Sequence, residues 1–195
     1  MAGLNRTGLL LLSAALVTAP VAVSAQSTAT LDPNHTATHF AAKHLLISTV
    51  QGSIPIKSTA VSLGEDFVPT SIEAVMEMTK IDTHNEKRDD DLRSERFLDV
   101  AKYPEMTFKS TKITHQGNNL AITGDLTIRG VTKPVVLSGT IEGTVKDSRG
   151  RTHVGYAATT KIDRRDFNVG SSIPAAVVSN EIDITIEAEA IVSSS

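Results

Sequence analysis

The sequence predicts an all-β fold, an antiparallel sheet of about eight strands with one short helix. The chief observation is that apolar and polar residues alternate in segment after segment, so each strand has one apolar and one solvated face. Turn signals rich in Gly and Asn separate several of these segments. The chain has 195 residues, enough for one domain with a sizeable core. This number of strands favours a barrel or a sandwich, because both architectures protect sheet edges.

Residues 1–25 have the pattern of an export signal. Arg6 precedes the apolar run "GLLLLSAALVTAPVAV", and Val23 and Ala25 are small residues placed for cleavage. A retained membrane anchor is the alternative, which Pro20 disfavours. We therefore expect cleavage after Ala25, a mature domain over residues 26–195, and a periplasmic or secreted location. No later apolar run is long enough for a membrane span.

The expected strands follow one another along residues 26–195, with turns between them. Turns are expected at 116–119, where "QGNN" stands, at 129–134 and at 147–151. The alternating segments are 36–45, 71–81, 106–114, 119–130, 133–145, 153–162 and 181–192.

The connection 84–102 interrupts the alternation and contains three consecutive acids, Asp89–Asp91. A calcium loop needs alternate ligands and a glycine at its sharp turn, and this segment has neither. We prefer a short helix that begins near Thr83 or Asn85, with acids in its first turns and Arg93 placed four residues after Asp89. Its apolar side consists of Leu92, Phe97 and Leu98.

Catalytic, metal and nucleic-acid functions find little support in the composition. The chain has no Cys, so it has no cysteine nucleophile and no disulfide, and it has no GxSxG motif. His35 and His39 share a strand face but would stand about 13 Å apart, too far for one ion. A net charge of −3 and the absence of Trp argue against nucleic-acid binding. We expect no catalytic residue, no metal and no cofactor.

The apolar faces leave the state of the interior open. Small residues stand where barrels often have larger ones: Ala42, Ala74, Ala158, Ala188 and Ala190. These residues fit either a cavity for a long flexible ligand or a small core rich in alanine. His44 lies on the apolar face of its strand beside Phe40, where a buried imidazole would bond either a ligand or a backbone carbonyl.

Four segments resemble the YceI family in order and spacing: "LDPNHTATHFAAKHLLISTVQGSIPI", "KIDTHNEKRDDDLRSERFLDVAKYPEMTFKST", "ITGDLTIRGVTKPVVL" and "IDRRDFNVGSSIP". The resemblance extends over Leu31–Val192. It implies an elongated, hollow, lipocalin-like barrel of eight strands. It also implies an exported protein that binds a polyisoprenoid or a similar long amphiphile without chemistry.

The resemblance also implies which residues face the ligand. They are Phe40, Ala42, His44, Met76, Met78, Met106, Phe108, Leu126, Ile128, Tyr156, Ala158 and Ile184. Asp91 replaces a histidine common in the family, and Asn168 replaces a common glycine, which a left-handed conformation tolerates.

The expected partner is therefore a long-chain isoprenoid or lipid, carried or sequestered by a protein that is not an enzyme. Two alternatives are a stress-associated interaction module with a filled core, and a hydrolase or isomerase that uses His44. A homodimer is also possible.

Overall fold

A computed structural model of the protein describes residues 27–192. The expected export signal and its cleavage site lie outside these residues. Within them the strands are β1 (Ser27–Leu31), β2 (Ala37–His44), β3 (Ser48–Ile54), β4 (Ile56–Leu63), β5 (Pro69–Glu77), β6 (Glu105–Gln116), β7 (Asn119–Ile128), β8 (Val131–Lys146), β9 (Thr152–Asp163) and β10 (Val178–Val192). The helical elements are α1 (Glu86–Arg93) and the 3₁₀ turns η1 (Glu65–Phe67), η2 (Met78–Lys80) and η3 (Arg164–Phe167).

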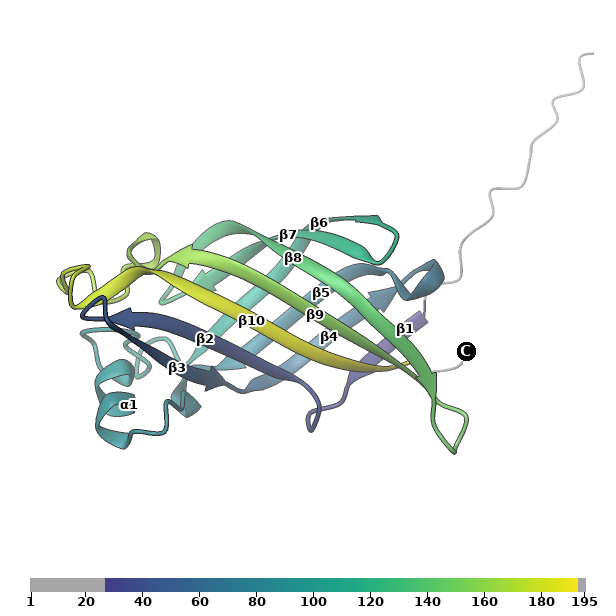
Figure 1. The fold of residues 1–195 in the computed structure, drawn as a ribbon, viewed down its shortest axis with the longest axis horizontal. Helices are drawn as coiled ribbons and strands as arrows, with labels where there is room; N and C mark the ends of the chain where they lie inside the picture. Colours follow the sequence, from purple (N-terminus) through teal and green to yellow (C-terminus); the bar gives the residue numbers. More distant parts are fainter. Residues whose placement is uncertain (1–26, 193–195) are drawn as a thin grey trace, which may run out of the picture.

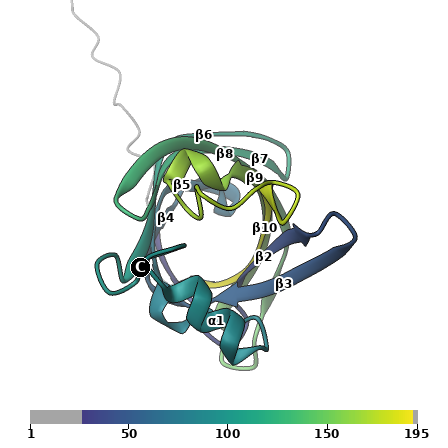
Figure 2. The ribbon, with the colours of Figure 1, turned by 90° about the vertical axis from the view of Figure 1, so that its left-hand side faces the viewer.

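The strands form one closed antiparallel barrel (Figures 1 and 2). The sheet order is β1-β4-β5-β6-β7-β8-β9-β10-β2-β3, and β1 also pairs with β10. Both β1 and β2 pair with β10, with Ala29 opposite Val192 and Phe40 opposite Ile184. On their other side β1 pairs with β4, and β2 pairs with β3. Ten strands thus occupy eight positions around the barrel, which confirms the predicted eight-stranded architecture.

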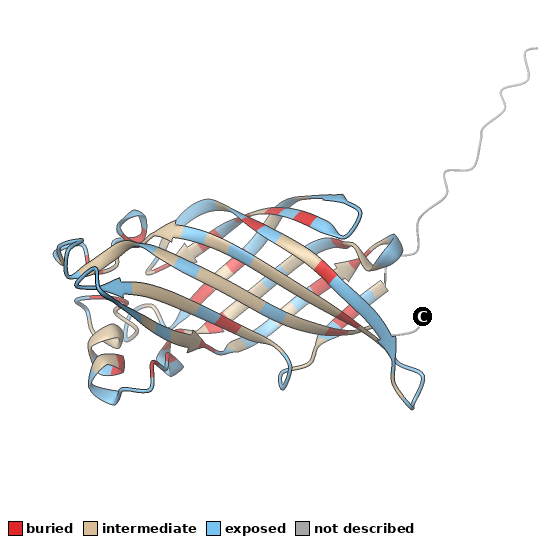
Figure 3. Ribbon diagram, viewed as in Figure 1, coloured by how far each residue is buried: buried red, intermediate tan, exposed pale blue. Residues whose placement is uncertain are grey.

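The alternation of the sequence appears directly as alternating burial along the barrel wall (Figure 3). In β7, Leu120, Ile122, Leu126 and Ile128 are buried, and Ala121 and Asp125 between them are exposed. Each fully buried aliphatic side chain contributes about 1.5–3 kcal/mol relative to an exposed one. Burial of one face therefore fixes which residues point into the barrel.

Turn chemistry sets the register between neighbouring strands. β7 and β8 are joined by Arg129 and Gly130 alone, with φ angles of 51° and 72°. Positive φ at both residues is typical of the hairpin turn that matches the twist of the flanking strands. The predicted bend at this point is therefore a tight two-residue turn, and the predicted turns at 116–119 and 147–151 are also present.

Helix α1 forms where the sequence predicts it, but one of its ion pairs differs. The Asn85 side chain caps the helix by accepting from the backbone N–H of Arg88 at 3.0 Å. Arg93 pairs with Asp90 at 2.7 Å and not with Asp89. Asp89 is buried and accepts hydrogen bonds from the backbone and hydroxyl of Thr83, so its carboxylate is turned away from solvent.

Other differences concern strand limits. The predicted strand 71–81 ends at Glu77, because the chain turns into η2, where the Met78 N–H donates to the Pro104 carbonyl at 2.9 Å. Strands β1, β3 and β4 were not among the segments singled out from the sequence.

One end of the barrel has more covering structure than the other. Helix α1, η3 and the chain from η3 to β10 lie at the same end as the β2–β3 hairpin, as Figure 2 shows. The termini of the described chain lie at the opposite end (Figure 1). In the described residues no helix is long and apolar enough to cross a membrane.

Candidate functional site

The barrel interior contains a first apolar cavity of about 140 Å³. Every strand from β4 to β10 contributes lining residues, and Tyr156 is the one titratable residue among them. Sheet register assembles this lining, since Met76 stands opposite Met106, and Phe108 stands between Ala74 and Leu126. The lining of this cavity is therefore almost wholly apolar.

A second cavity of about 130 Å³ continues toward the end of the barrel covered by α1. It shares Thr38, Met106 and Ile184 with the first cavity, so the two lie end to end. Phe97 and Leu98, which follow α1, are buried and line this cavity, as their predicted packing role requires. The two cavities together follow the long direction of the barrel.

A third, outer cavity of about 550 Å³ lies between the end of β2, helix α1 and residues 173–178. It shares Phe40, Ala42, Leu92, Phe97 and Val178 with the second cavity. Its remaining lining is largely polar and charged. We call this cavity the mouth.

Each of the twelve residues proposed as ligand contacts lines at least one of these cavities. The first cavity contains Met76, Met106, Phe108, Leu126, Tyr156, Ala158 and Ile184. The second contains Phe40, Ala42, Met78, Met106, Ile128 and Ile184, and the mouth contains Phe40, Ala42 and His44. Their contact with a ligand stays a prediction.

His44 differs most from its expected environment. The strand alternation placed it on the apolar face, but β2 ends at His44, and its side chain is exposed at the mouth. The expectation of a buried imidazole is therefore wrong, because the barrel wall no longer covers the last residue of the strand.

Comparisons with known proteins agree with this architecture. A sequence profile described as the YceI-like domain matches residues 30–190. The protein YceI from Escherichia coli O17:K52:H18 is 34% identical over 171 residues, which cover 87% of this chain and 88% of that protein. The chain belongs to the YceI family.

Solved structures extend the comparison to three dimensions. The crystal structure of a Campylobacter jejuni YceI protein matches this YceI-family chain with a TM-score of 0.68 and 32% identity, covering 76% of this chain and 88% of that one. A polyisoprenoid binding domain from Saccharophagus degradans matches with a TM-score of 0.57 and 13% identity, covering 87% of this chain and 99% of that one. At that identity the second match shows the fold alone.

Tyr156 brings a polar group into the apolar interior of this YceI-family barrel without leaving it unpaired. Its hydroxyl donates to the Phe67 carbonyl at 2.7 Å. Burial raises the pKa of Tyr156 to about 12, so the phenol stays protonated at neutral pH. The hydroxyl therefore acts as a structural donor that ties η1 to β9.

Arg164 is a key buried residue that the sequence reasoning did not single out. It is 3% exposed, and its side chain donates to backbone carbonyls along residues 169–179, including Val169 at 2.9 Å and Ile173 at 2.7 Å. Burial lowers the pKa of its guanidinium group. The run "RRDF" has the appearance of an exposed charged turn, so its only signal was its place in a segment that resembles the family.

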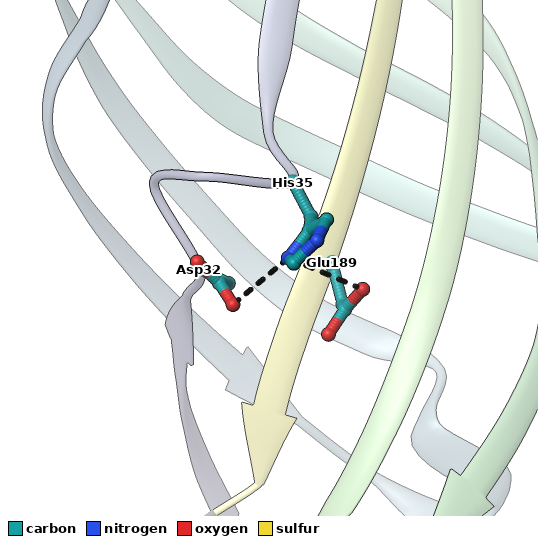
Figure 4. A group of neighbouring side chains, drawn as sticks. All are labelled: Asp32, His35 and Glu189. Carbon is teal, nitrogen blue, oxygen red and sulfur yellow. Dashed lines mark hydrogen bonds and ion pairs between the residues drawn. The ribbon is translucent and has the colours of Figure 1, made fainter.

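A second polar cluster lies on the outside of the barrel, at the interruption between β1 and β2. His35 Nδ1 stands 3.1 Å from Asp32 Oδ2 and 3.9 Å from Glu189 Oε2, as Figure 4 shows. The sequence reasoning treated His35 as a strand residue, but β2 begins at Ala37, and the turn brings His35 to the acids. Three such groups within 4.8 Å have the geometry of a metal site, but exposed groups of this kind also pair without a metal.

The same cluster extends into the barrel wall through His153. Its two ring nitrogens lie 2.6 Å from Glu189 and 3.2 Å from Asp147. Hydrogen bonding to Glu189, and then to Asp147, raises the pKa of His153, and bonding to Asp32 raises the pKa of His35. The hydrogen bonds of His35 and His153 thus link β9 and the β1–β2 turn to β10.

Proposed function

We propose that the protein binds a long-chain, isoprenoid-like amphiphile in the barrel and carries or sequesters it without chemical change. The observation that supports this most is the pair of apolar cavities that lie end to end inside the barrel. Methionine side chains on neighbouring strands, Met76 and Met106, adapt to a flexible chain better than branched residues do.

Burial of the chain supplies the affinity. Each buried CH₂ group contributes about 0.8 kcal/mol, so one five-carbon isoprene unit contributes on the order of 3–4 kcal/mol before ordering costs. The mouth then contacts the polar head group and sets the orientation of the ligand. A hollow interior gives no support to the alternative of a filled core.

Binding is favoured over catalysis by the chemistry of the lining. The first cavity offers no acid–base pair, because its one titratable group, Tyr156, already donates to a carbonyl. His44 is exposed, and within residues 27–192 its ring makes no hydrogen bond or ion pair with an acid. These features leave the hydrolase or isomerase alternative without an acid–base pair in the first cavity.

A structural relative and the sequence support the remaining parts of the proposal. The Saccharophagus degradans neighbour is described as a polyisoprenoid binding domain, and its barrel is similar in fold. Residues 1–25 have the pattern of an export signal, so we propose that the mature protein acts outside the cytoplasm.

Native mass spectrometry of residues 26–195 tests the proposed function. The purified protein should carry a lipid of defined mass, or should gain one when a prenyl alcohol or a prenyl quinone is added. The matched control is a one-unit isoprenoid alcohol, which buries too little apolar surface to remain bound. A protein that carries no lipid and ignores both long-chain ligands would refute the proposal.

A further inference from the structure

The hairpin tip between β2 and β3 consists of three exposed aliphatic residues, Leu45, Leu46 and Ile47. Their side chains are 50%, 68% and 86% exposed. Three consecutive large aliphatic residues at a solvent-exposed tip are unusual, because hairpin loops favour Gly, Asn and Asp. The tip extends from the barrel beside the covered end, as Figure 2 shows.

The backbone at the tip makes these residue types costly. Leu45 and Leu46 have φ angles of 50° and 62°, a left-handed conformation in which Gly or Asn is the usual choice. The loop is held in this form, since the Leu45 N–H donates to Val177 and the Ile47 N–H donates to His44. Strain maintained at an exposed apolar site is a feature of functional surfaces.

Basic side chains surround the adjacent mouth. Lys43 and His44 end β2 directly before the tip, and Asp91 is the one acidic residue in the lining. The basic residues that line the mouth are Lys43, His44, Lys87, Arg88 and Arg96. The chain as a whole carries a net charge of −3, so this basic surface is local to the mouth.

We infer that the β2–β3 tip and the mouth dock on an anionic lipid surface, with Leu45–Ile47 in the apolar layer and the basic residues at the head groups. Apolar insertion together with adjacent Lys and Arg residues is the combination that peripheral proteins use for reversible membrane binding. Charge complementarity favours a membrane with acidic head groups over a neutral one. The purpose of docking, transfer of the ligand between bilayer and barrel, rests on the proposed function.

Vesicle sedimentation tests the docking. The mature protein should sediment with vesicles of equimolar phosphatidylglycerol and phosphatidylcholine, and much less with phosphatidylcholine alone. The double substitution Leu46→Asn and Ile47→Gln should weaken binding by about tenfold or more. Asn tolerates positive φ, so this variant is expected to remain folded.

Matched variants separate the two contributions. Val145 is also an exposed aliphatic residue, at 65%, but it lies near the end of β8 that is far from the mouth. The variant Val145→Gln should therefore bind vesicles as the wild type does. Lys43→Gln with Lys87→Gln should reduce the preference for anionic vesicles by about tenfold. In the variant Ile47→Trp, the single Trp of the chain should show blue-shifted emission on anionic vesicles.

The outcomes distinguish docking from the proposed function. The double variant Leu46→Asn, Ile47→Gln, here called the tip variant, should still bind prenyl alcohol in native mass spectrometry. Neither changed residue lines the two inner cavities or the mouth. Wild-type protein that ignores both vesicle types would overturn the inference, as would equal vesicle binding by the tip variant. Self-association that the tip variant abolishes, without vesicle binding, would also overturn it and assign the tip to a second copy of the chain.

Discussion

At the scale of single residues, the width of the interior depends on where large and small side chains meet. The Phe108 ring lies over Gly124 on the neighbouring strand, in space that a Cβ atom at Gly124 would occupy. The Phe40 ring lies in the same way against Gly52. The side chain of Met106 also affects the width of the interior, because it lines both inner cavities and lies where they meet.

Replacing Met106 with Trp should divide the interior. The larger side chain fills space that both cavities share, so a long prenyl chain should bind about tenfold or more weakly, since burial of at least one isoprene unit is lost. A shorter chain that needs one cavity should lose much less affinity. Tryptophan fluorescence and native mass spectrometry with ligands of increasing length measure the effect.

The control for Met106→Trp is Val136→Trp on the exposed face of β8, where the residue is 54% exposed. Binding in that variant should match the wild type. Unchanged affinity of Met106→Trp for the longest chain would mean that one ligand does not occupy both cavities.

Arg164 gives a second prediction at this scale. Arg164→Lys keeps the charge but removes most of the donors that satisfy carbonyls of residues 169–178, so unfolding free energy should fall by about 2–4 kcal/mol. Urea unfolding measures the change. Arg165→Lys is the control, since Arg165 is exposed and within residues 27–192 forms an ion pair with Asp163 alone, and its effect should stay within about 0.5 kcal/mol.

At the scale of elements, period-two alternation identified the long strands and failed at the short ones. β4 pairs with β5 through a register shift between Ile56 and Ser58, so its inward residues do not keep a strict period of two. β3 has mostly exposed or half-buried residues and contains Gly52, which weakens its pattern further. Local bulges of this kind are invisible to a simple alternation count.

The histidine cluster that links β1, β9 and β10 predicts a pH dependence. The pKa values of His35 and His153 are raised above their ordinary value of 6.5, so their stabilising contribution is complete below 6.5 and is lost as pH rises through the raised values. Hydrogen bonds from Asn34 and His35 lower the pKa of Asp32 below 3.8, so its contribution is lost as pH falls below that value. The cluster should therefore stabilise the protein most between these limits.

Thermal unfolding over a pH series tests this. The melting temperature should fall from mildly acidic to alkaline pH, and His153→Gln should flatten part of that slope. His115→Gln is the control, because His115 is exposed on β6 and makes no ion pair within residues 27–192. An unchanged pH slope in His153→Gln would contradict the assignment.

At the scale of the whole molecule, the residue pattern predicts an all-β antiparallel fold, but the choice of a barrel over a sandwich and the hollow interior come only from the resemblance to a family. Alternating segments and tight turns fix the class and approximate number of strands. Alanine at inward positions fits a cavity and a small core equally well, and only the resemblance to a family favoured the cavity. Burial of His44 was misjudged because alternation shows the face of a residue but not where the wall ends.

Ligand binding should stabilise the barrel as one unit, because the inner cavities are lined by strands from around the whole wall. At a free ligand concentration of one hundred times Kd, unfolding free energy rises by about 2.7 kcal/mol. For a chain of this size that corresponds to an increase in melting temperature of about 5–10 °C.

Differential scanning calorimetry with and without a long prenyl alcohol measures this increase. A one-unit alcohol at the same concentration serves as the control and should produce little change. A ligand seen in native mass spectrometry that leaves the melting temperature unaltered would indicate attachment outside the barrel.

The pairing of Ala29 with Val192 has a practical consequence for handling the protein. Both ends of the described chain leave the barrel at the end away from α1 (Figure 1). An affinity tag, a fluorescent fusion or a surface linker joined at either end of the expected mature chain, residues 26–195, therefore anchors the molecule with its mouth directed outward. A sensor chip prepared in this way presents every copy in one orientation, suited to measuring capture of amphiphiles from solution.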